Sequence, residues 1–140
     1  MTKRVIPSLF FSAALLFSVP ALAQNDSIVL NNNASAAGQM TAEKFNSLLT
    51  QQGFKSVIVN RPDQELGNTV TVNELRNIAE KSHVSVIYQP VISGKISQTD
   101  VAEFAKYYNE LPKPILMVCK SGSRSSSLFN QAKAQGLLHE

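Results

Sequence analysis

The fold class of this 140-residue chain is inferred first from one stretch, Leu116-Met117-Val118-Cys119-Lys120-Ser121-Gly122-Ser123-Arg124-Ser125-Ser126. It joins an apolar strand to a Gly/Ser loop, and the residues that follow have the pattern of a helix. A small-residue loop after a strand turns its backbone N–H groups inward, and the next helix adds the positive end of its dipole. These groups favour ionised sulfur in Cys119, and thiolate is the nucleophilic form of cysteine. The stretch therefore predicts an anion pocket built around a thiolate.

Each residue of this loop has a chemical role that its side chain or backbone can provide. Gly122 permits the backbone φ that turns amide groups inward, and Arg124 offers a planar charge that can hold an oxyanion through two hydrogen bonds. Ser125 can hydrogen-bond the thiolate or a leaving sulfur, and Ser121 and Ser123 keep the loop small. The alternative interpretation is an inert buried cysteine, which is common among free cysteines but does not require Gly and Arg in the next turn.

Outside this loop, strand and helix patterns alternate along the chain. Runs rich in apolar and β-branched residues at 57–59, 84–88 and 115–118 predict strands of a largely buried sheet. Apolar residues at helical spacing predict helices over residues 41–52, 72–81 and 97–111, and another after the Cys119 loop. This order predicts an α/β fold with a mostly parallel central sheet flanked by helices. Ligands of such folds bind at the carboxyl ends of the strands, where Cys119 stands.

The first 23 residues have the pattern of a signal peptide. Lys3 and Arg4 precede an apolar run from Val5 to Val19, and Pro20-Ala21-Leu22-Ala23 provides an Ala-x-Ala cleavage site. The run is shorter than the ~20 residues that a membrane-spanning helix needs, so a stable membrane anchor is not expected. The sequence predicts cleavage after Ala23 and a periplasmic or secreted protein.

The remainder is predicted to contain a polar leader over residues 24–36 and one compact domain over residues 37–140. The leader is rich in asparagine, and its one apolar patch, Ile28-Val29-Leu30, is a candidate edge strand. The length after residue 23 suits a single hydrophobic core.

The charge balance excludes some classes of partner. The chain has 13 Lys and Arg residues against 10 Asp and Glu, but Lys3 and Arg4 belong to the predicted signal peptide, which leaves 11 against 10. No basic run or basic and aromatic stripe remains, so a nucleic-acid partner is not expected. His83 and His139 have no second ligand at metal-binding spacing, so no metal and no cofactor is predicted.

Cys119 to Ser125 resembles the anion loops of cysteine-dependent protein phosphatases and of rhodanese sulfurtransferases. Ala37-Gly38-Gln39-Met40-Thr41, the segment from Gly53 to Asp63, and Tyr88-Gln89-Pro90-Val91 resemble a narrower group. That group is the bacterial beta-lactamase-hydrolase-like, phosphatase-like family, whose members are also labelled sulfurtransferases. The resemblance covers residues 37–129 and implies the cysteine-phosphatase fold of dual-specificity phosphatases. It also implies that Cys119 is the nucleophile, that the amides of Lys120 to Arg124 form the oxyanion cradle, and that Arg124 is the clamp.

The chain departs from the phosphatase pattern in two ways. Phosphatases of this type place five residues between Cys and Arg, whereas Cys119 and Arg124 enclose four, a size that resembles rhodanese loops. Their general acid, an Asp upstream of the Cys, would fall at Ser93-Gly94, where no carboxylate stands. Asp100 and Asp63 are the candidates nearby. Asp100 also suits the first turn of a helix, and Asp63 also suits a turn after proline.

These features predict an exported cysteine-dependent phosphatase-like hydrolase that acts slowly on phosphoesters, because loss of general acid catalysis costs about 10²–10⁴-fold. Its substrate would be a small anionic or phosphorylated molecule. Two alternatives stay open: a rhodanese-type sulfurtransferase that carries a Cys119 persulfide from a sulfur donor, and a non-catalytic anion-binding or redox module. The sequence carries no prediction of oligomeric state.

Overall fold

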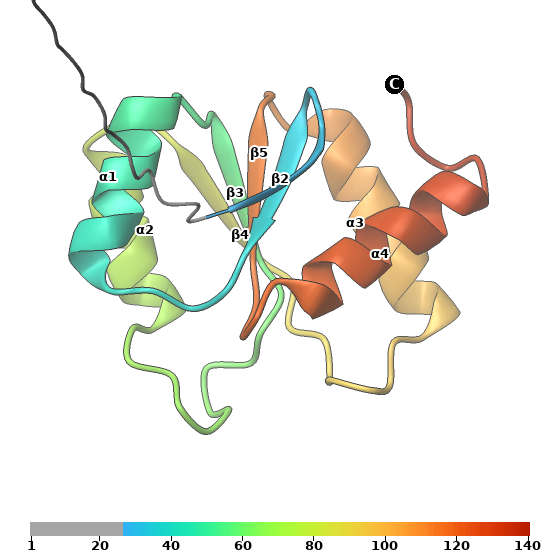
Figure 1. Ribbon diagram of the computed structural model, residues 1–140, viewed down its shortest axis with the longest axis horizontal. Coiled ribbons are helices and arrows are strands. Elements are labelled where there is room, and N and C mark those ends of the chain that lie inside the picture. Colours follow the sequence, from blue (N-terminus) through green and yellow to red (C-terminus); the bar gives the residue numbers. More distant parts are fainter. Residues whose placement is uncertain (1–26) are drawn as a thin grey trace, which may run out of the picture.

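The computed structural model describes residues 27–140, which form a five-stranded sheet between two pairs of helices (Figure 1). In chain order the elements are β1 (Ile28–Asn31), β2 (Ala34–Ala37), α1 (Ala42–Gln52), β3 (Ser56–Val59), α2 (Val72–Glu80), β4 (Ser85–Tyr88), α3 (Gln98–Glu110), β5 (Ile115–Val118) and α4 (Ser123–Ala134). The predicted signal peptide, residues 1–23, lies outside the described residues. No helix within residues 27–140 is long and apolar enough to cross a bilayer.

The strand order is β1-β2-β5-β3-β4, and every pair is parallel except β1 with β2. The predicted α/β class with a mostly parallel sheet is therefore confirmed. Because β5 lies between β2 and β3, the loop that follows it emerges at the middle of the carboxyl edge of the sheet. The loops after β3 and β4 leave the same edge, as Figure 1 shows at the bottom of the view.

The central strands are buried on both faces, which explains their continuous apolar runs. In β3, Val57 and Val59 pack on one side, whereas Ile58 packs on the other. Figure 1 shows α1 and α2 on one face and α3 and α4 on the other. The first pair contributes Phe45, Leu48, Leu49 and Leu75 to its core, and the second contributes Phe104, Tyr108, Leu128 and Phe129. The sheet is therefore the middle of three layers, with helices covering both of its faces.

Three helices begin at hydroxyl side chains that accept hydrogen bonds from the first turn: Thr41 in α1, Thr71 in α2 and Ser97 in α3. In α2 and α3 the third helical residue, Glu74 or Asp100, completes a capping box. The predicted helices are confirmed with small shifts at their ends, since α2 ends at Glu80 rather than Lys81.

The amino-terminal part of the sheet differs from the prediction. The candidate edge strand at Ile28-Val29-Leu30 is confirmed as part of β1, but the sequence did not indicate β2. All four residues of β2, Ala34–Ala37, are buried between β1 and β5. Alanine and serine have weak strand propensity, and here burial in the sheet overrides it. The sheet consequently begins well before the predicted domain boundary at residue 37, within the segment expected to be a leader.

Candidate active site

The Cys119 loop is held against the end of β2. The N–H of Cys119 donates to the carbonyl oxygen of Ala37 at 3.0 Å, and the N–H of Gln39 donates to that of Lys120 at 3.1 Å. Between these two bonds, Gly38 forms a bridge with Ser121. A Cβ atom on Gly38 would lie 2.8 Å from the Lys120 carbonyl oxygen, so no larger residue fits without moving the loop. The strand that the sequence did not indicate thus shapes the anion loop.

Gly122 lets the chain turn from the loop into α4. Its φ of 93° lies in the left-handed region that favours glycine. In this conformation its N–H donates to Cys119 Sγ at 3.0 Å. Gly122 is also the N-cap of α4, whose positive dipole end therefore lies at the sulfur. In the structure Gly122 therefore provides both the turn and one N–H group directed at the sulfur.

Cys119 is 1% exposed, and its environment favours the thiolate. Burial raises the pKa of the thiol. Hydrogen bonds from the backbone and side chain of Ser125, and from the N–H groups of Ser121 and Gly122, outweigh burial, so the pKa lies below its usual value. Hydrogen bonds to the charged form, together with a helix N-terminus, are the usual means of activating a cysteine.

A pocket of about 310 Å³ opens at the sulfur. Its lining comes from the Cys119 loop, from the start of α4 and from the loop after β4: Ser93, Gly94, Ile96, Cys119, Lys120, Ser121, Ser123, Arg124 and Ser127. Ser93 and Gly94 stand in the pocket wall, where the resemblance to phosphatases would place a general acid. None of these lining residues is a carboxylate, so the wall offers Lys120 and Arg124 as its charged groups.

Arg124 reaches the pocket from α4, but its guanidinium is already engaged. It is 7% exposed, and its Nη1 donates to the Val91 carbonyl oxygen at 2.8 Å. Its Nη2 lies 2.9 Å from Glu65 Oε2 and 3.0 Å from Glu65 Oε1. Glu65 therefore orients the predicted clamp, and sequence reasoning missed it. The available signal was a carboxylate in the loop after β3, which the parallel sheet brings to the same edge as Cys119.

The two candidate general acids are both engaged at helix starts. Asp100 Oδ2 accepts from the N–H of Ser97 at 2.9 Å, which is half of the α3 capping box. Asp63 Oδ1 accepts from the N–H of Val72 at 3.0 Å, and Arg61 Nη1 lies 3.7 Å from the same oxygen. Neither aspartate lines the pocket at Cys119. The structure thus shows the capping contacts that compete with an acid role, and it brings neither carboxylate to the sulfur.

Behind the sulfur lies a buried polar network that the sequence did not reveal. The Ser125 hydroxyl donates to Asn60 Oδ1 at 2.8 Å. Asn60 Nδ2 faces the carbonyl oxygen and the Oε1 of Gln89 at 3.3 and 3.4 Å. Gln89 Nε2 donates to the Asp100 carbonyl oxygen at 2.9 Å. The network therefore connects α4, the ends of β3 and β4, and the first turn of α3.

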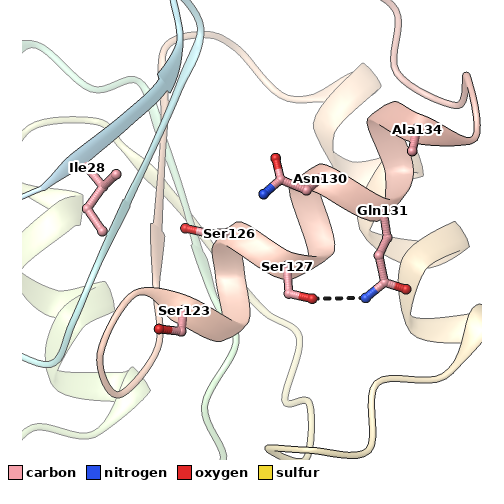
Figure 2. Close-up of a pocket in the computed structure, with 7 residues that line it drawn as sticks. All are labelled: Ile28, Ser123, Ser126, Ser127, Asn130, Gln131 and Ala134. Atoms are coloured by element: carbon pink, nitrogen blue, oxygen red, sulfur yellow. Dashed lines mark hydrogen bonds between the residues drawn. The ribbon is translucent and has the colours of Figure 1, made fainter.

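A second, shallower groove of about 520 Å³ adjoins the Cys119 pocket and shares Ser123 and Ser127 with it. Figure 2 shows Ile28 of β1 facing one side of α4, on which Ser126, Asn130, Gln131 and Ala134 complete the lining. Gln131 donates to Ser127 at 2.9 Å, as drawn in Figure 2. No lining residue of this groove is titratable. In the part of the chain that the structure describes, no three His, Cys, Asp or Glu side chains are grouped to hold a metal ion.

A buried cysteine lies at the end of the central strand of a three-layer α/β fold, and solved phosphatase structures share this fold. The family model described as "Beta-lactamase hydrolase-like protein, phosphatase-like domain" matches residues 24–136. The chain belongs to this family, as the motifs predicted. The match begins at residue 24, so the family pattern includes the residues of β1 and β2.

Curated relatives of the chain are longer proteins. A beta-lactamase hydrolase-like protein from Agrobacterium fabrum is 30% identical over 100 residues, and one from Xylella fastidiosa is 26% identical over 100 residues. Each match covers 71% of this chain but only 23% of the relative. The chain therefore spans about a quarter of the length of these relatives.

Solved structures share the fold. A proposed phosphatase from Neisseria meningitidis has 25% identity and a TM-score of 0.74, and the match covers 81% of this chain and 80% of that one. A proposed phosphatase from Shewanella putrefaciens has 20% identity, a TM-score of 0.67 and coverage of 79% and 69%. The core catalytic domain of a PP-IP phosphatase from S. cerevisiae has 14% identity, a TM-score of 0.58 and coverage of 82% and 78%. The last two similarities concern the fold alone.

Proposed function

We propose that this protein hydrolyses small phosphomonoesters through a phosphocysteine on Cys119. The observation that carries the proposal is a buried thiol that accepts a hydrogen bond from the Gly122 N–H at the start of α4, an environment that also holds its pKa below the ordinary value. Membership of the phosphatase-like family supports it. Arg124, fixed by Glu65, would bind the phosphoryl oxygens at the mouth of the pocket.

The reaction has two displacements at phosphorus. In the first, the Cys119 thiolate forms an S–P bond while the P–O ester bond breaks, and the leaving oxygen takes a proton from water. In the second, water attacks phosphorus, the S–P bond breaks and the sulfur leaves as thiolate, with inorganic phosphate as product. Because no carboxylate lines the pocket, esters of acidic alcohols such as phenols suit it best, and alkyl esters should react about 10²–10⁴-fold more slowly than with a general acid.

The charge of the pocket favours substrates with a single phosphoryl group. Lys120 and Arg124 are its charged lining residues, and the adjoining groove contributes none. A polyanionic substrate would place its further phosphates against uncharged side chains. We therefore expect monophosphates to be hydrolysed in preference to polyphosphorylated molecules.

The decisive experiment is hydrolysis of p-nitrophenyl phosphate by wild type and by Cys119→Ser. We expect the variant to lose activity and the wild type to yield a phosphorylated Cys119 peptide after acid quenching. Equal hydrolysis by the two proteins would refute the proposal. Lys133→Arg, an exposed change on α4 outside the pocket, is the matched control and should hydrolyse the ester like wild type.

Sulfur transfer is the second candidate, because four residues separate Cys119 from Arg124 and the pocket wall has no carboxylate. Here the thiolate would take the outer sulfur of thiosulfate and release sulfite, and cyanide would remove that sulfur as thiocyanate. A protein mass increased by one sulfur atom, with thiocyanate production, would support this reaction. Absence of both would leave the phosphatase or a non-catalytic anion-binding or redox module, and the latter would bind phosphate or sulfate without turnover.

We also propose that the protein is exported, on the basis of the pattern in residues 1–23. Fractionation of cells that express the full chain should place it in the periplasm or medium, with a mature amino terminus at Gln24. Replacing Val5 to Val19 in part with charged residues should retain it in the cytoplasm.

A further inference from the structure

The uncharged groove beside the Cys119 pocket continues from that pocket along the exposed side of α4 (Figure 2). Its volume is about 520 Å³, and it shares Ser123 and Ser127 with the pocket. A phosphoryl group held at Cys119 would therefore have the organic part of its ester beside this groove. The groove is accordingly the place in the described structure where that organic part can be recognised.

The apolar wall of the groove lies against the anion loop. Ile28 of β1 is 52% exposed, and a Cβ atom on Gly122 would lie 3.3 Å from the Cδ1 of Ile28. Ile28 thus adjoins the residue whose N–H donates to Cys119 Sγ. Figure 2 shows Ser126 and Asn130 directed from α4 toward the side on which Ile28 lies. A ligand in the groove would meet hydrocarbon on one side and hydrogen-bonding groups on the other.

The polar side chains of the groove have unused donors and acceptors. Gln131 Nε2 donates to Ser127 Oγ at 2.9 Å, which leaves Gln131 Oε1 to accept and the Ser127 hydroxyl to donate. The Ser126 hydroxyl donates to the Gly122 carbonyl oxygen at 2.8 Å, so its oxygen can still accept. In the part of the chain that the structure describes, the Asn130 side chain makes no hydrogen bond to protein, so its amide can do both. The groove therefore offers donors and acceptors together.

The exposed side of α4 differs in charge from that of the other described helices. Those helices expose several charged residues each, namely Glu43 and Lys44 in α1, Glu74, Arg76 and Glu80 in α2, and Glu103, Lys106 and Glu110 in α3. On α4 no charged residue stands between Arg124 and Lys133. A solvated helix face usually carries charge. Uncharged hydrogen-bonding residues in a groove beside the Cys119 pocket therefore point to a neutral polar ligand.

The lining of the groove disfavours other kinds of organic group. It has no cationic side chain to hold a second phosphate and no aromatic ring on which a nucleobase could stack. Ile28 and Ala134 are its apolar residues, which is too little hydrocarbon to cover an acyl chain. Sugar hydroxyls both donate and accept, as the serine and amide side chains of the groove do. The C–H groups of a sugar ring can pack on Ile28.

We propose that this groove is the subsite for the leaving group and that it binds an uncharged sugar, which makes sugar monophosphates the substrate class. The phosphoryl group lies at Cys119, and the sugar ring lies between Ile28 and α4. An ester at the anomeric oxygen suits the site best, because the anomeric hydroxyl is a stronger acid than an ordinary alcohol. Such a leaving group depends less on the general acid that the pocket lining lacks.

The inference rests on the proposed function in that the Cys119 pocket holds the phosphoryl group, but its test measures binding and needs no turnover. Isothermal titration calorimetry with Cys119→Ser, which lacks the nucleophile, compares glucose 1-phosphate, cyclohexyl phosphate and inorganic phosphate. Cyclohexyl phosphate has a ring of similar size without hydroxyl groups. We expect glucose 1-phosphate to bind about 10-fold more tightly than either of the other two, because only its hydroxyls can use the polar side chains of the groove.

A groove variant in the same Cys119→Ser background tests where this preference arises. Asn130→Leu combined with Gln131→Leu removes both amides, which are exposed and do not line the Cys119 pocket. We expect this variant to bind inorganic phosphate as before and glucose 1-phosphate about 10-fold more weakly. Asn77→Leu, which changes an exposed amide on α2 outside both the pocket and the groove, is the matched control and should alter neither affinity.

Equal binding of glucose 1-phosphate and cyclohexyl phosphate, an unchanged glucose 1-phosphate affinity in the groove variant, or no binding of any probe would overturn the inference. Should the groove variant not fold, Asn130→Ala replaces it, and an unchanged glucose 1-phosphate affinity there would overturn the inference equally. Any of these results together with Cys119-dependent hydrolysis of p-nitrophenyl phosphate by wild type would leave the proposed function standing. Groove-dependent binding of glucose 1-phosphate, with no hydrolysis of any phosphate ester by wild type, would refute the proposed function alone.

Discussion

The loop after β5 and the loop after β3 meet at one edge of the sheet, but they contribute different things. The first, beginning at Cys119, supplies the sulfur and the backbone N–H groups around it. The second supplies side chains that orient those of the first, since Asn60 accepts from Ser125 and Glu65 pairs with Arg124. The cysteine and the N–H groups around it thus come from a few consecutive residues, whereas the side chains that orient Ser125 and Arg124 come from a distant part of the chain.

The two loops also differ in the hydrogen bonds that the guanidinium groups of Arg124 and Arg61 make. Arg124 lines the pocket and has partners for both terminal nitrogens, whereas Arg61 is 1% exposed and donates from Nη2 to the Val70 carbonyl oxygen at 2.6 Å. Burial lowers the pKa of Arg61, while Asp63, Glu65 and Tyr88 raise it and Arg124 lowers it further. Under the proposed function Arg124 binds the anion, whereas Arg61 connects residues of the second loop through the Val70 carbonyl oxygen.

The largest effect on activity is expected from changing the anion clamp in the first loop. Arg124→Lys keeps one positive charge but cannot reproduce planar, two-point contact with Glu65 and substrate. We expect kcat/KM for p-nitrophenyl phosphate to fall on the order of 10²-fold. Steady-state kinetics beside Lys133→Arg, an exposed change on the same helix, would check this. Wild-type kcat/KM in Arg124→Lys would show that the arginine only supports the fold.

A smaller effect is expected from the support that the second loop gives to the clamp. Glu65→Gln removes the charge but retains an oxygen that can accept from Arg124 Nη2. If the weaker Glu65–Arg124 contact costs roughly 1 kcal/mol of transition-state binding free energy, kcat/KM should fall about 5- to 10-fold. The exposed neighbour Gln64→Ala should be neutral in the same assay. A fall as large as that of Arg124→Lys would mean that the two loops act as one unit.

The pH dependence of Cys119 alkylation reports how the groups around the sulfur change the pKa of the thiol. Because the pKa of Cys119 is lowered, the midpoint of the pH dependence of alkylation should lie below 9.0, the ordinary value for this thiol. By linkage, this depressed folded pKa contributes stability above the unfolded pKa, and the contribution is lost as pH falls through the folded pKa. Urea unfolding of wild type and Cys119→Ala should therefore diverge in favour of wild type as pH rises through this window. An alkylation midpoint at or above 9.0 would contradict the prediction.

The smallest effect on activity is expected at the two aspartates that cap helices. Asp100→Asn and Asp63→Asn each weaken a helix-start contact, so each should lower the free energy of unfolding by ~1 kcal/mol and leave kcat nearly unchanged. Thermal unfolding and aryl phosphate kinetics measure the two quantities. A fall in kcat of about 10²-fold or more for either variant would instead identify that carboxylate as the general acid.

Local patterns in the sequence predicted most of the fold and the first loop. Helix caps such as Ser97, the buried strand of β3 and the Cys119 motif each show their role within a few residues. Glu65 and Asn60 do not, because their partners on α4 lie 59 and 65 positions away and only the strand order brings them together. β2 was missed for a related reason, since alanines become a strand here through burial rather than propensity.

The close approach of Gly38 to the Lys120 carbonyl oxygen joins the beginning of the fold to its last third. A fragment that starts at residue 39 would keep the complete Cys119 motif and every charged group of the site, yet lose the wall that gives the motif its shape. Its sequence would still contain every residue of the Cys119 motif. The pH dependence of Cys119 alkylation would reveal the loss.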